Sequence, residues 1–149
     1  MNTPPPLKTV LLVEDSENDI EITLEALHEY NLANQIDIVR DGVEALDYLF
    51  RRNQYASRPD RAPVVVLLDV KLPKLSGIEV LREIRAAPRY ARLPVVMVTS
   101  SREEPDLRAC YEHGCNAYVV KPVDFPQFSE ALKVVGCFWA VLNEPPLIE

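Results

Sequence analysis

The sequence is short of cysteine, has no excess of basic residues and contains no long apolar run. Its three cysteines, Cys110, Cys115 and Cys137, cannot all pair within one chain, so they fit a reducing compartment. The net charge of −7 repels phosphate backbones and anionic lipid headgroups. The longest apolar run, at 134–142, is too short to cross a bilayer, and the N-terminus lacks a secretory pattern. We therefore expect a cytoplasmic protein that binds neither nucleic acid nor membrane.

The remaining composition is that of an ordinary globular protein. The chain has 149 residues, of which 48% are hydrophobic. A chain of this length buries roughly two thirds of its unfolded surface in one core. Proline-containing, linker-like segments occur at both ends. We expect one domain over residues 7–142, between a flexible tail at 1–6 and a C-terminal tail at 143–149.

Short apolar runs alternate with segments of helical periodicity. The runs, rich in leucine or β-branched residues, lie at 9–13, 36–40, 64–68, 95–99 and 117–120. Apolar residues between them recur at helical spacing, and a last helix is expected to begin near Asp124. Strands that are apolar throughout are buried on both faces, as in a parallel sheet covered by helices. The pattern predicts an α/β, doubly wound, five-stranded parallel sheet.

Polar residues follow the predicted strands at the points where these strands end. Glu14 and Asp15 follow the first, Asp69 follows the third, Thr99 ends the fourth and Lys121 follows the fifth. Right-handed crossovers bring these ends to one edge of the sheet, where ligands bind. Carboxylates about 5 Å apart repel by roughly 3 kcal/mol per pair at an effective dielectric near 20. One ammonium cannot neutralise three such charges, and an all-oxygen site favours Mg²⁺ or Mn²⁺.

An aspartate beside such an ion is a competent nucleophile toward phosphorus. The metal and the lysine absorb the negative charge that develops on the transferring group. We therefore interpret Asp69 as a carboxylate fixed for in-line attack on a phosphoryl group.

Four segments carry a family resemblance: LLVEDSEND, VVLLDVKLPKLSG, VVMVTSS and AYVVKPV. Together they resemble the response-regulator receiver family over about residues 7–142, which implies a flavodoxin-like (βα)5 fold. The resemblance implies that Asp69 is the phosphoacceptor and that Asp15 binds Mg²⁺ directly. It also implies that Glu14 binds the ion largely through water and that the backbone carbonyl of Lys71 is a further ligand.

The same resemblance assigns roles on the later strands. Thr99 would bind the arriving phosphoryl group, Lys121 would pair with it, and Tyr118 matches the aromatic residue that turns inward as the threonine moves. The peptide bond between Lys121 and Pro122 is expected to be cis. The implied function is that of a phosphorelay protein that takes a phosphoryl group from a sensor histidine kinase and signals through protein contacts, without enzymatic turnover.

A long loop at 53–63 and an extended last helix resemble the stand-alone receivers that serve bacterial phytochrome-type histidine kinases. We expect no output domain. Two positions depart from the common pattern of the family: Lys71, where a small or neutral residue is usual, and Ser101, where an acid or amide is frequent. Both flank the path of water to an aspartyl phosphate, so we expect Lys71→Asn to change the lifetime of the phosphoryl group.

The last helix has two apolar stripes. One stripe is predicted to pack on the sheet, and a neighbouring one, Ala131, Val134, Phe138 and Val141, is too apolar for a solvated face. This pattern suggests a homodimer built around the last helix. A helix wedged deeper into its own domain is the alternative.

Other interpretations of these residues remain open. The acids after the first strand could cap the next helix, Thr99 could be an ordinary strand residue, and the arginines around 51–61 and 82–92 are expected to form solvated faces. Cys110, His113 and Cys115 make a poor zinc site, and the cysteines are expected to be buried or half-buried thiols. A haloacid dehalogenase-type phosphohydrolase would need a second aspartate after Asp15, and a flavin carrier would need an uncharged phosphate loop there.

Overall fold

The structure is a computed structural model that describes residues 8–28, 34–100 and 104–134. Five parallel strands form one sheet in the order β2-β1-β3-β4-β5, which confirms the predicted doubly wound α/β fold. The strands are β1 (Lys8–Val13), β2 (Asn34–Val39), β3 (Val65–Asp69), β4 (Val95–Thr99) and β5 (Ala117–Val120).

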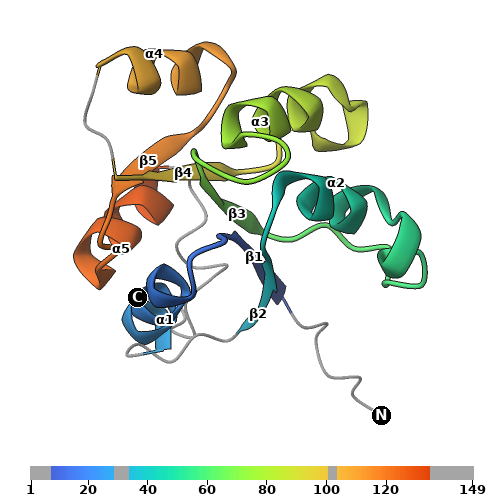
Figure 1. Ribbon diagram of the computed structural model, residues 1–149, viewed down its shortest axis with the longest axis horizontal. Helices are drawn as coiled ribbons and strands as arrows, with labels where there is room; N and C mark the ends of the chain where they lie inside the picture. Colours follow the sequence, from blue (N-terminus) through green and yellow to red (C-terminus); the bar gives the residue numbers. More distant parts are fainter. Residues whose placement is uncertain (1–7, 29–33, 101–103, 135–149) are drawn as a thin grey trace, which may run out of the picture.

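Helices cover both faces of this sheet. They are α1 (Glu17–His28), α2 (Gly42–Phe50), α3 (Gly77–Ala86), α4 (Glu104–Glu112) and α5 (Phe125–Val134), with short 3-10 helices at Asn53–Tyr55 and Pro88–Tyr90. Figure 1 shows α1 and α5 on one face and α2, α3 and α4 on the other. Within the described residues, no helix is long and apolar enough to span a membrane.

The core consists of two apolar layers, one on each side of the sheet. Alternate residues of β3 contribute to opposite layers: Val66 and Leu68 pack with α2 and α3, whereas Val65 and Leu67 pack with α1 and α5. All residues of β3 are buried. The uninterrupted apolar strands therefore reflect burial on both faces, as the sequence predicted.

Side-chain caps fix where the helices next to the sheet edge begin. The Oγ of Ser76 accepts a hydrogen bond from the N–H of Glu79 at 3.2 Å at the start of α3. The Oγ of Ser16 accepts from the N–H of Asp19 at 3.3 Å at the start of α1.

Arg58 is not part of a solvated face, so that prediction was wrong for this residue. Its Nε donates to the carbonyl of Tyr48, its Nη1 donates to the carbonyl of Arg61, and both distances are 2.9 Å. The guanidinium also stacks on the Tyr48 ring, 4.1 Å from its centroid. Arg58 thus fastens the long loop to α2.

Arg85 on α3 also departs from the predicted solvated face. Its guanidinium donates to the carbonyl of Gly114, to the carbonyl of Tyr90 and to Oδ1 of Asn116, at 2.9, 3.1 and 2.9 Å. The planar fork of arginine suits three acceptors in fixed directions. One side chain thereby joins α3 to the segments before β4 and β5.

The described part of α5 corrects one feature of the predicted second stripe. Ala131 is buried in the core with Phe128 and Leu132, because the core side of this helix is wider than one stripe. Val134 is 64% exposed, as a residue outside the core stripe should be. Phe138 and Val141 lie outside the described residues.

Candidate functional site

The carboxyl ends of β1 and β3 lie side by side where the strand order reverses. Val13 is in register with Leu68, so Glu14 and Asp69 follow at the same level. On the other side of β3, Asp69 is in register with Val98, next to Thr99. The backbone N–H of Lys121 donates to the carbonyl of Thr99 at 2.8 Å, which brings the residue after β5 to the same edge. The predicted strand-end residues therefore meet in one place.

Three of these residues form an acidic cluster. Glu14, Asp15 and Asp69 each offer a carboxylate oxygen, and these oxygens lie within 4.8 Å of one another. Glu14 and Asp69 are buried, whereas Asp15 is exposed at the mouth of the cluster. An all-oxygen set that is open to solvent on one side suits Mg²⁺ or Mn²⁺, which retain water ligands.

The surroundings of Asp69 disfavour its charged form. Burial raises the pKa of this carboxyl, and repulsion by Glu14 raises it further, while Lys121 opposes both effects. The result is a pKa of about 7. A divalent cation beside Asp69 would favour the ionised form, so the donor set fits the ion that the sequence predicted.

Lys121 is the cation of the site. Its Nζ lies 2.8 Å from Oε1 of Glu14, 2.9 Å from Oδ2 of Asp19 and 3.1 Å from Oδ2 of Asp69. Burial alone would lower the pKa of this ammonium, but the hydrogen bonds to Glu14 and Asp19 and the attraction to Asp69 raise it. Lys121 is therefore held as a charged donor. The peptide bond to Pro122 is cis, as predicted.

Asp19 is a member of the site that the sequence analysis missed. It lies in the first turn of α1, and its side chain is 30% exposed. The available signal was its position in EDSEND, four residues after Asp15. The first turn of α1 begins at Glu17, close in the chain to the end of β1.

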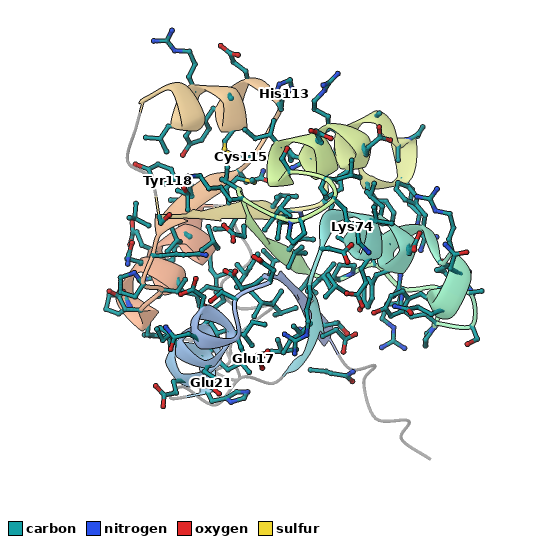
Figure 2. All side chains as sticks on the ribbon, viewed as in Figure 1. Glu17, Glu21, Lys74, His113, Cys115 and Tyr118 are labelled. Atoms are coloured by element: carbon teal, nitrogen blue, oxygen red, sulfur yellow. The ribbon has the colours of Figure 1, made fainter. Side chains whose placement is uncertain are left out.

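The structure describes three of the other predicted residues, Lys71, Thr99 and Tyr118. The backbone N–H of Lys71 points to Oδ1 of Asp69 at 3.4 Å, and the Lys71 side chain is exposed. Thr99 is buried at the end of β4. Tyr118 lies on the α4 side of β5, and its half-buried ring packs edge-on against Tyr111 of α4, with 6.2 Å between centroids (Figure 2). Ser101 lies outside the described residues.

The cysteines near α4 take no part in a metal cluster. Cys110 and Cys115 are buried, and burial raises the pKa of the Cys115 thiol to about 12. Figure 2 labels Cys115 and His113 near the end of α4. Glu14, Asp15 and Asp69 form the only group with metal-ligand spacing in the part of the chain that the structure describes.

Comparison with known families agrees with the fold and the site. The family described as the response regulator receiver domain matches residues 10–133. The chain belongs to this family. Response regulator receivers are phosphoacceptor signalling domains, in which an aspartate takes a phosphoryl group in the presence of Mg²⁺. Neither the phosphohydrolase nor the flavin carrier considered from the sequence is consistent with this membership.

Individual receivers of known structure or sequence are similar over nearly the whole chain. Response regulator Rcp1 of Synechocystis is 37% identical over 134 residues, which are 90% of each protein. The bacteriophytochrome response regulator AtBRR is 54% identical, with a TM-score of 0.85 over 94% of this receiver and all of that chain. The structure of the Mn²⁺-bound form of Rcp1 is 36% identical, with a TM-score of 0.74 over 95% and 99% of the two chains.

Proposed function

We propose that Asp69 of this receiver accepts a phosphoryl group from the histidine of a sensor kinase in a reaction that requires Mg²⁺. The observation that carries the proposal is the position of the Asp69 carboxylate, buried beside two other acids and 3.1 Å from the ammonium of Lys121. The proposed receiver domain spans residues 7–142.

The residues of the acidic cluster have distinct proposed roles. Asp15, Asp69 and the backbone carbonyl of Lys71 would bind Mg²⁺ directly, and Glu14 would bind it largely through water. The ion supplies positive charge for the phosphoryl oxygens. Mn²⁺ would replace it, because the donor atoms are the same.

The transfer itself needs only a carboxylate nucleophile. An oxygen of Asp69 forms a bond to phosphorus while the bond from phosphorus to the imidazole nitrogen of the donor breaks. The leaving imidazole nitrogen takes a proton from solvent. Lys121 and Thr99 would hold the transferred group through charge-assisted and neutral hydrogen bonds.

Phosphorylation is proposed to be read out through protein contacts. Thr99 would move toward the phosphoryl group and Tyr118 would turn inward, which changes the surface of β5 and α4. The ring contact between Tyr118 and Tyr111 is the feature that such a movement would break. The proposed kinase is a bacteriophytochrome, which is supported by the similarity to AtBRR, a bacteriophytochrome response regulator.

We further propose a homodimer around the last helix and a cytoplasmic location. The exposed Val134 on α5 supports the dimer, and an odd number of cysteines fits a reducing compartment. Phe138→Asp tests the dimer: the hydrodynamic mass should fall to that of a monomer. A Phe138→Asp variant that stays dimeric would rule out a dimer interface at the last helix.

The central experiment is incubation with Mg²⁺ and a small acyl-phosphate donor, followed by intact-mass measurement. We expect one phosphoryl adduct on the unmodified sequence and none on Asp69→Asn. Asp124→Asn, which replaces an exposed aspartate before α5, should retain the adduct. An adduct on Asp69→Asn, or sustained hydrolysis of a generic phosphate ester, would contradict the proposal.

A further inference from the structure

Three carboxylates contact the Lys121 ammonium, two of them through hydrogen bonds and all three as ion pairs. Glu14, Asp19 and Asp69 lie 2.8, 2.9 and 3.1 Å from its Nζ. An ammonium has three donors and no more. A phosphoryl oxygen that pairs with Lys121 must therefore displace one of these carboxylates or share a hydrogen with it.

Asp19 is the carboxylate that a phosphoryl oxygen can displace from Lys121 most easily. Glu14 and Asp69 belong to the metal-binding cluster and their side chains are 2% and 6% exposed, so their positions are constrained. Asp19 lies outside that cluster, and its side chain is 30% exposed. A carboxylate that is accessible to water loses less stabilisation when its ammonium partner moves away, because water solvates its charge.

The placement of Asp19 is nevertheless well defined. Its backbone N–H donates to Oγ of Ser16 at 3.3 Å, and the N–H of Ser16 donates to Oε2 of Glu14 at 3.2 Å. The cap of α1 thus links the acid that contacts Lys121 to the acidic cluster itself. Asp19 is consequently presented to the ammonium by the start of the helix.

The charge of Asp19 also opposes the incoming group. The site contains four carboxylates and one ammonium: Glu14, Asp19 and Asp69 contact Lys121, and Asp15 lies beside Glu14 and Asp69. A divalent cation still leaves one negative charge in excess, and the phosphoryl group adds more of the same sign. Without Asp19 the site with its cation would be neutral.

We propose that Asp19 is a positioning residue that holds Lys121 in the resting protein and competes with the phosphoryl group for it. The inference rests on the proposed role of Asp69 as phosphoacceptor. Asp19 secures the orientation of Lys121 before transfer and lowers the occupancy of the phosphorylated state. Its effect is exerted through Lys121 and not through contact with phosphorus.

Beryllium fluoride, a phosphoryl mimic on carboxylates, provides the test when it is titrated at saturating Mg²⁺ and followed by fluorine NMR. Asp19→Asn and Asp19→Ala should lower the half-saturating concentration by about three- to tenfold, because the competing charged hydrogen bond is lost. Asp19→Glu, which keeps the charge, should stay near the unmodified protein. Glu21→Gln removes an exposed charge from the same helix and should change nothing.

A merely structural role gives the opposite result, since loss of a supporting contact would weaken binding. Equal or weaker binding by both neutral variants, with the unmodified protein binding normally, overturns the inference. Failure of the unmodified protein to bind, or equal binding by Asp69→Asn, overturns the proposed function instead. Saturating Mg²⁺ removes any difference in cation affinity from the comparison.

Discussion

The Nζ of Lys121 lies 3.1 Å from Oδ2 of Asp69, although Asp69 ends β3 and Lys121 follows β5. This contact lowers the pKa of a carboxyl that burial and Glu14 raise. Because of Lys121, Asp69 is ionised in a larger fraction of the molecules, and the ionised carboxylate is the nucleophile. The balance between these effects makes the site sensitive to pH and to divalent cations.

Without Mg²⁺, the stability of the protein should carry a pH dependence from Asp69. The pKa of this carboxyl rises from 3.8 to about 7 on folding, so between these values the folded state holds a proton that the unfolded state has lost. Unfolding then releases a proton, and stability falls as pH rises from about 4 to about 7. Thermal unfolding of the unmodified protein and of Asp69→Asn, which cannot titrate, measures this contribution.

The difference in melting temperature, Asp69→Asn minus unmodified protein, should increase across that range. Glu21→Gln serves as the control, since it replaces an exposed carboxylate on α1. A difference that is constant with pH would show that Asp69 is ionised throughout.

Addition of Mg²⁺ should stabilise the folded protein, because the ion binds a cluster that only the folded chain assembles. At a concentration one hundred times the dissociation constant the gain is about 2.7 kcal/mol. Below about pH 7 the gain should shrink, since a proton competes with the ion for Asp69. Melting temperatures with and without a chelator measure the effect, and Asp15→Asn should remove most of it.

Gly77→Ala should impair both stability and phosphorylation. A Cβ at Gly77 would collide with the carbonyl oxygen of Asp69 and lie 2.9 Å from Cα of Val70. The backbone there has little freedom, because the N–H of Gly77 donates to the carbonyl of Val70 at 2.8 Å. We expect a loss of about 1–3 kcal/mol and slower formation of the adduct.

The matched control for this change is Gly114→Ala. Gly114 has φ of +95°, so alanine is strained there too, but the contacts are with the Arg85 side chain, away from the acids. It should cost stability in denaturant unfolding and leave the phosphorylation rate unchanged. Equal slowing by both variants would indicate a general loss of structure.

Lys71→Asn should shorten the lifetime of the phosphoryl group without preventing its formation. Lys71 is exposed next to the acceptor, and asparagine, being shorter, would uncover the approach of water to the aspartyl phosphate. We expect decay about two- to fivefold faster. Intact mass after removal of the donor follows the decay. Lys74→Asn, on the same loop but paired with Asp41 at 3.4 Å, should decay as the unmodified protein does.

Arg85→Lys should destabilise the protein by about 1–3 kcal/mol. The planar guanidinium of Arg85 donates to three acceptors in fixed directions, and the ammonium of lysine cannot replace all three hydrogen bonds. Arg82→Lys, at an exposed position of the same helix, should have little effect. Denaturant unfolding of the two variants gives the comparison. Equal stability would mean that the Arg85 contacts contribute nothing net.

The two arginines show where sequence patterns are insufficient. Charged residues at the end of a helix and in a polar loop usually face water, so Arg85 and Arg58 were expected to do so. Their acceptors are mostly backbone carbonyls of Gly114, Tyr90 and Tyr48. Any residue type can supply a backbone carbonyl, and therefore no pattern of side chains in the sequence predicts such a contact.

The amino-acid sequence alone predicted the order of strands and helices, the parallel sheet and the position of the acidic residues at the edge of that sheet. It did so because hydrophobic periodicity is local, and parallel connections bring every strand's carboxyl end to one edge. Only the folded structure decided which of these groups touch. It set Asp19 of α1 beside Lys121, 102 residues later, and buried Asp69 enough to raise its pKa. Both depend on distances and solvent exclusion across elements, which no local pattern of residues contains.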